Sequence, residues 1–194
     1  MKKITAIIGA ALAVVLSACA QNKSQDNSSK ETAVTPSRAI VVCFSATGTT
    51  KAEALLISRA EDTRLDDISP VEPYTPADLD WNNKQSRSSV EMADAKARPA
   101  IKPIDTNFSG YDVVYLGYPI WWDLAPRVVY TFLDTYDLKG KTIIPFATSG
   151  GSTITNSVKD LRKTYPALKF EDGRLLNDAD QPAVTAWVKS LSAH

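Results

Sequence analysis

Residues 38–59 read RAIVVCFSATGTTKAEALLISR. The first seven, 38–44, are mostly apolar and β-branched, which is typical of a strand buried on both faces. The last nine, 51–59, space their apolar residues as a helix with one face toward a core does. The six residues between them, 45–50, are small or carry hydroxyls. This stretch therefore predicts a strand, a tight turn and a helix in direct succession.

The same alternation of strand and helix continues along the chain. Further strands are predicted at 64–68, 112–116, 141–147 and 167–170, and further helices at 86–95, 126–135, 155–164 and 180–191. This alternation implies an α/β fold of three layers, a parallel sheet covered by helices on both faces. Residues 69–107 contain five prolines and form a long connection, and such connections in a compact domain are usually functional or partly structured.

The turn after the first strand is a candidate phosphate site. A phosphate needs backbone N–H groups at a helix N-terminus and hydroxyl donors that leave room for its oxygens. This turn supplies them with Ser45, Ala46, Thr47, Gly48, Thr49 and Thr50. The triphosphate motif GxxxxGK[ST] and the dinucleotide motif GxGxxG are both absent from the sequence, which favours a monophosphate bound without metal. Taken alone, the turn could equally be a simple helix cap.

Two further loops follow predicted strands, and the carboxyl ends of parallel strands share one edge of a sheet. One loop could give a flat ring its aromatic and apolar walls, with Tyr118, Pro119, Ile120, Trp121 and Trp122. The other could address a polar ring edge through amides and hydroxyls, with Thr148, Ser149, Gly150 and Gly151. The alternatives are aromatic side chains that close the core and a plain connection from strand to helix.

Taken together, the three loops resemble those of the flavodoxin family. SATGTT (45–50) matches the S/T-x-T-G-x-T phosphate loop of that family, and the other two loops match its two flavin-ring loops. Four segments look more narrowly like a bacterial flavodoxin-like subfamily that is often found as exported or stand-alone proteins: PYTPADLDW (73–81), SRSSVEM (86–92), LGYPIWW (116–122) and PFATSGGS (145–152). The resemblance covers 38–194 and implies a doubly wound flavodoxin-like fold with a five-stranded parallel sheet in the order 2-1-3-4-5.

The resemblance also implies non-covalently bound FMN. Its phosphate would lie on residues 45–50, its ring against residues 118–122, and residues 148–151 on the other side of the ring. Two features differ from electron-carrier flavodoxins. Those proteins are usually strongly acidic, whereas this chain has a formal net charge of zero. They also tend to carry acidic side chains and a tyrosine in the third loop, which TSGGS (148–152) lacks, so both differences argue against a small soluble shuttle.

The N-terminal residues predict export and lipid anchoring. Lys2 and Lys3 precede an apolar stretch that ends in Leu-Ser-Ala-Cys, which resembles a bacterial lipobox. Residues 1–18 are therefore expected to be a lipoprotein signal peptide and Cys19 the lipidated first residue of the mature protein, with an ordinary signal peptide as the alternative. Residues 20–37 are polar and predict a flexible tether. The domain would then lie at the cell envelope, outside the cytoplasm, on the periplasmic side in a Gram-negative cell, with the lipid as its contact with the membrane.

The amino-acid composition limits the kinds of site and partner that can be expected. The single histidine is His194, the last residue of the sequence, which disfavours zinc sites and His-based nucleophile pairs. With a net charge of zero and no basic cluster beyond Lys2 and Lys3, no nucleic-acid partner is expected. Cys43 lies in an apolar run and is expected to be a buried core residue. The chemistry is therefore expected to belong to a bound cofactor.

Three functions remain open from the sequence. The first is a tethered electron carrier that passes electrons between redox partners at the envelope. The second is an FMN-dependent reductase of quinones or other small-molecule acceptors, of a kind that is often a homodimer. In that case residues 69–107, with Trp81, Arg87 and Ser88, would form a substrate lid, although a plain covering loop is the favoured alternative. The third is a flavin-free interaction module of the envelope.

Overall fold

The computed structural model describes residues 38–191. Its sheet is parallel throughout and has the strand order β2-β1-β3-β4-β5, which confirms the predicted order and fold. The strands are β1 Ala39–Cys43, β2 Leu65–Asp67, β3 Val113–Pro119, β4 Thr142–Thr148 and β5 Lys169–Phe170, and a further strand, β6 Arg174–Leu175, also pairs with β4.

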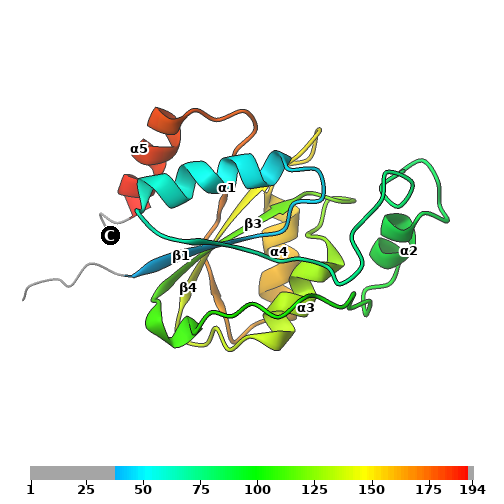
Figure 1. Cartoon of the computed structure of the whole chain (residues 1–194), viewed down its shortest axis with the longest axis horizontal. Helices are drawn as coiled ribbons and strands as arrows, with labels where there is room; N and C mark the ends of the chain where they lie inside the picture. The colour runs from blue at the N-terminus through cyan, green and yellow to red at the C-terminus, as the bar shows by residue number, and fades with distance from the viewer. Residues whose placement is uncertain (1–37, 192–194) are drawn as a thin grey trace, which may run out of the picture. The chain divides into compact units, whose positions relative to one another are not determined.

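Helices cover both faces of the sheet, giving the three predicted layers (Figure 1). Because side chains alternate along a strand, each strand feeds two cores. Ile40 and Val42 of β1 face one core, which also contains side chains of α3 Arg127–Thr135 and α4 Thr155–Thr164. Val41 and Cys43 face the other core, which contains side chains of α1 Thr49–Ala60 and α5 Gln181–Leu191. Cys43 is thus buried, as predicted, and burial raises the pKa of its thiol.

The fifth strand is split into β5 and β6, and Pro145 of β4 explains the break. Ile143 and Ala147 each accept a hydrogen bond from the edge side, from Glu171 and Leu176. Pro145, midway between them, faces the same side but has no N–H to donate. The chain therefore leaves the sheet opposite Pro145 and rejoins it at β6, so that the segment after β6 reaches the carboxyl edge of the sheet.

The connection 69–107 leaves the sheet and returns to it, and it has secondary structure of its own; we call it the excursion. Its two ends pair at the base, where the Val71 N–H donates to Ala100 O (2.9 Å) and the Lys102 N–H donates to Ser69 O (2.7 Å). Between these ends lies the short helix α2 Arg87–Ala93, capped by the side chain of Ser86. A 3₁₀ turn, Phe108–Gly110, then leads into β3. Figure 1 shows α2 standing beside the main α/β body.

The boundary of β3 differs from the sequence prediction. The strand continues to Pro119 and pairs with β4 as far as Thr148, whereas the sequence suggested an end at Leu116. Tyr118 is therefore a strand residue and not a loop residue. The predicted signal peptide, Cys19 and the tether lie outside the described residues. Within 38–191, none of the helices combines the length and the apolar character that crossing a membrane requires.

Candidate functional site

The three predicted loops meet at one cleft of about 710 Å³ at the carboxyl edge of the sheet. Its size falls in the usual range for small-molecule sites. From the sequence-predicted set it is lined by Ser45, Ala46, Thr47, Thr49, Thr50, Pro119, Ile120, Trp121, Trp122, Thr148, Ser149 and Gly150. Gly48, Tyr118 and Gly151 do not line it.

The first loop has the geometry of an anion cradle. Gly48 immediately precedes α1 and has a φ of 91°, a left-handed value that a glycine adopts without strain. Ser45 Oγ accepts a hydrogen bond from the Gly48 N–H (3.1 Å), which closes the turn, and the Thr47 and Thr49 hydroxyls lie 3.2 Å apart. The first N–H groups of a helix have no partner within the helix. Hydroxyls and free amides are thus brought to the same end of the cleft.

Thr50 links the first loop to the third. Its Oγ1 lies 2.8 Å from Thr148 Oγ1, and both side chains are buried. The two residues come from α1 and the end of β4, 98 positions apart in the sequence. A direct bond between these hydroxyls fixes the spacing of the two loops across the floor of the cleft.

The second loop turns sharply on two non-glycine residues. Trp121 and Leu124 exchange two backbone hydrogen bonds of 2.9 Å, while Trp122 and Asp123 have φ values of 45° and 66°. Such left-handed values at both central positions are typical of a type I′ turn, and they are strained for a tryptophan. Hydrogen bonds from Asn156 and Ser152 hold the Asp123 carboxylate in place and keep its pKa below its ordinary value. The turn leaves the Trp122 side chain 47% exposed in the cleft.

The Trp121 side chain is held in position by two other aromatic side chains. Its ring packs edge-on against Phe44, with centroids 5.5 Å apart, and against Tyr74, at 5.2 Å. Phe44 follows β1, and Tyr74 belongs to the excursion 69–107. The aromatic wall of the cleft therefore depends on contacts between three segments that are far apart in the sequence.

The third loop is held by a residue that the sequence did not indicate. The side chain of Asn177 accepts a hydrogen bond from the Ser149 N–H (2.9 Å) and donates one to Ser149 O (2.7 Å). Ser149 Oγ in turn accepts from the N–H groups of Gly151 (3.1 Å) and Ser152 (2.8 Å). The loop is thus ordered by side-chain contacts, with Asn177 as a clamp from the segment after β6.

Tyr118 requires a correction to the sequence interpretation. Its side chain is fully buried in the core beside α3 and α4, and its hydroxyl lies 3.0 Å from Ser157 Oγ. Burial raises the pKa of this hydroxyl. Because β3 extends through Tyr118, the alternation of the strand turns this ring into the core and away from the cleft.

Five residues outside the predicted set also line the cleft: Leu79, Trp81, Ser88, Asn177 and Asp178. The first three belong to the excursion, where Trp81 and Ser88 had been expected as part of a lid or cover. Asn177 and Asp178 follow β6, a strand of two residues that gives no usable periodic pattern. Asp178 has a φ of 49°, which an aspartate tolerates better than most residues.

The donor set of the cleft suits a ligand with one anionic group and a flat apolar body. Hydroxyls and amides gather at the α1 end, tryptophan, isoleucine and proline side chains come from the second loop, and the third loop adds further polar groups. None of the lining residues, all within 38–191, is a lysine or an arginine. In the same described range, no cluster of three or more His, Cys, Asp or Glu side chains is arranged to hold a metal ion.

Comparisons with known proteins agree with this architecture. A flavodoxin family model matches residues 38–191. A protein from Bacteroides eggerthii that has been assigned as a flavoprotein is 56% identical, with 80% of this chain and 98% of that chain covered and a TM-score of 0.77. A similarly assigned protein from Bacteroides uniformis is 48% identical, with coverages of 80% and 99% and a TM-score of 0.77. A search of curated proteins gave no match.

A more distant structure shows the same fold. A flavoprotein from Lactobacillus acidophilus, solved in complex with FMN, is 20% identical, with 74% of this chain and 95% of that chain covered and a TM-score of 0.60. The family match spans all of the described residues, and the strand order and the three loops at the carboxyl edge agree with it. The chain therefore belongs to the flavodoxin family.

Proposed function

We propose that this protein binds FMN in the cleft and transfers electrons at the cell envelope, held there by a lipid on Cys19. The observation that carries the FMN proposal is the convergence of three loops on one cleft that is lined by hydroxyl groups and by tryptophans. A family relationship and a fold shared with an FMN complex support it. When bound, FMN supplies chemistry in one-electron or two-electron steps.

The residues divide by the part of FMN that they suit. Thr47, Thr49 and the first amides of α1 suit the phosphate, because they offer donors without a bulky side chain. Trp121 and Trp122 suit the ring, since both present aromatic surface to the cleft. The third loop, which Asn177 clamps, suits the polar edge of the ring. These residues bind and orient the cofactor and shield one side of it from water.

The phosphate assignment can be tested by comparing FMN with riboflavin, which lacks the phosphate. The double variant Thr47→Ala/Thr49→Ala should weaken FMN binding by about a hundredfold or more, because two hydrogen bonds to a charged group are lost and each is worth roughly 1.5–3 kcal/mol. Riboflavin affinity should stay the same. Thr135→Ala, an exposed hydroxyl at the end of α3 and outside the cleft, serves as the control. Unchanged FMN affinity, or equal losses for both ligands, would place the phosphate elsewhere.

The anchoring proposal needs a separate experiment, because Cys19 lies outside the described residues. The full-length protein should take up an alkyne analogue of palmitate in a bacterial host and sediment with membranes. Cys19→Ser should abolish both the label and the sedimentation, while leaving the domain folded. Labelling that persists in the variant, or no labelling of the parent protein, would contradict the proposal.

A further inference from the structure

One wall of the cleft comes from the excursion 69–107, and the three FMN loops do not account for it. Leu79, Trp81 and Ser88 form this wall. Trp81 is 72% exposed, although a large aromatic side chain gains little from facing water. Trp122, 47% exposed, lines the same cleft from the second loop. Two tryptophans that keep open surface in one concave site are suited to a flat ligand.

Ser88 places a polar group on this otherwise apolar wall. It is 1% exposed and still lines the cleft. Its Oγ lies 3.5 Å from Ser86 Oγ, which is at the outer limit of a hydrogen bond. Ser86 Oγ has a better partner in Ser89 Oγ at 2.8 Å. Since a buried hydroxyl is costly to leave without a good partner, the Ser88 O–H is suited to donate to an oxygen of a ligand.

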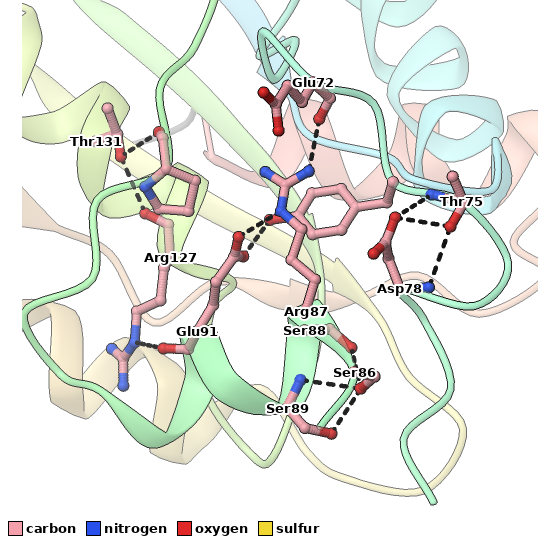
Figure 2. Close-up of polar contacts among 12 residues, drawn as sticks. Glu72, Thr75, Asp78, Ser86, Arg87, Ser88, Ser89, Glu91, Arg127 and Thr131 are labelled. Atoms are coloured by element: carbon pink, nitrogen blue, oxygen red, sulfur yellow. Dashed lines mark hydrogen bonds and ion pairs between the residues drawn. The ribbon is translucent and has the colours of Figure 1, made fainter. Parts of the chain in front are cut away.

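The wall is fixed in position by a polar network around Arg87. Figure 2 shows this guanidinium between the Glu91 carboxylate, at 2.6 Å, and the backbone oxygen of Glu72, at 2.7 Å. It also lies over the Tyr74 ring, 4.1 Å from the centroid, and Tyr74 donates its own hydrogen bond to Glu91. From the main body, the buried Arg127 donates to Met92 O at the end of α2 (3.1 Å).

The turn that carries Leu79 and Trp81 is fixed as well. Asp78 accepts hydrogen bonds from the Thr75 N–H (2.8 Å) and hydroxyl (2.7 Å), as Figure 2 shows. Its backbone oxygen accepts from the Ser88 N–H at 3.0 Å, which ties this turn to α2. The excursion is therefore a preformed wall rather than a loose lid, and a preformed wall lowers the ordering cost of binding a ligand.

We propose that Leu79, Trp81 and Ser88 form a second subsite, beside the FMN loops, for an uncharged planar conjugated ring molecule that bears a carbonyl oxygen, such as a quinone. Trp81 stacks on the ring, and the Ser88 hydroxyl donates to the carbonyl. Asp178 is the one ionisable side chain among the lining residues, all within the described range, and this disfavours an anionic ligand. The proposal rests on the proposed function in that the subsite shares its cleft with FMN.

The test is the affinity of the oxidised, FMN-saturated protein for 2,3-dimethyl-1,4-naphthoquinone, measured by calorimetry. Trp81→Ala should weaken this binding about tenfold, in line with the value of stacking on an aromatic side chain, and should leave FMN affinity unchanged. Ser88→Ala should weaken the quinone several-fold but not 2,3-dimethylnaphthalene, which lacks the carbonyls. Val90→Ala, at a residue of α2 that is 52% exposed and does not line the cleft, is the control and should change neither.

The outcomes separate this proposal from the previous one. No quinone binding to the saturated protein, or a loss of FMN affinity in Trp81→Ala with quinone affinity intact, would overturn the subsite. Absence of flavin binding before quinone is added would contradict the proposed function instead. The same quinone titration on the flavin-free protein would then decide the subsite, which a Trp81-dependent affinity would support and an absence of binding would overturn.

Discussion

At the scale of single residues, the buried pair Thr50 and Thr148 determines how the first and third loops meet. Thr50→Val keeps the shape of the side chain but leaves the Thr148 hydroxyl without its partner. We expect a loss of roughly 1–3 kcal/mol in the free energy of unfolding, measured by urea denaturation. Adding Thr148→Val should cost much less than the sum of the two single changes, because no orphaned hydroxyl remains. Strict additivity would show that the hydroxyls do not interact.

A second prediction concerns the buried carboxyl of Glu53 on α1. Burial raises its pKa, and in the described structure its Oε2 has no hydrogen-bond partner. The folded state therefore binds this proton more tightly than the unfolded state does. Stability from this group is greatest below the unfolded pKa, near pH 4, and falls as the pH rises toward the folded value.

Removing that charge should consequently stabilise the protein at neutral pH. Glu53→Gln keeps an oxygen that can accept from the Ala179 N–H, a contact that the carboxylate makes. We expect the melting temperature to rise by roughly 2–4 °C at pH 7 and by clearly less at pH 4. Thermal denaturation at the two pH values gives both numbers. A variant that melts lower than the parent at pH 7 would contradict the assignment.

Some residues of the cleft could be predicted from the residue types in the sequence, and others could not. That the hydroxyls of 45–50 and the tryptophans of 118–122 lie in one cleft could be predicted, because the loops that carry them follow buried strands of one parallel sheet. Tyr118 was assigned wrongly because the direction of its side chain depends on where β3 ends, and pairing with β4 decides that. The role of Asn177 could not be predicted from the sequence, because it depends on a contact with Ser149, 28 positions earlier.

At the scale of elements, the split fifth strand depends on Gly173. This residue has a φ of 74°, and a Cβ built on it would lie 2.5 Å from Pro145 O. Gly140 has a similar φ of 76°, and no atom lies within 4 Å of a Cβ built on it. A substitution at Gly140 therefore measures the cost of the backbone strain without a steric clash. Gly140→Ala should cost roughly 1–2 kcal/mol. Gly173→Ala should cost roughly 1–3 kcal/mol more, by urea denaturation, since β4 must move. Equal costs would show that the contact is unimportant.

The main strands and helices could be predicted from apolar periodicity, because burial on one or both faces leaves that pattern in the sequence. The interruption between β5 and β6 could not, since each piece is two residues long and the cause lies in the neighbouring strand at Pro145. Helix boundaries differ by a residue or two, as at α3, which begins at Arg127 directly after the predicted Pro126.

At the scale of the whole molecule, the fold gathers three loops and the excursion 69–107 around one cleft. The order of strands and helices was enough to predict that the three loops share an edge of the sheet. The position of the excursion beside this cleft could not be predicted from the order of strands and helices. Its position depends on distant contacts, such as Arg127 with Met92 and Tyr74 with Trp121, that leave no local pattern.

The central claim is that the cleft binds FMN, and the most direct test is an absorbance and fluorescence titration of purified residues 38–194 with FMN. We expect one FMN per chain, a shift of the flavin absorbance bands and strong quenching of flavin fluorescence by Trp121 and Trp122. Trp122→Ala should reduce that quenching without changing the stoichiometry. Unchanged flavin spectra together with an unchanged melting temperature in excess FMN would contradict the account and favour a flavin-free interaction module.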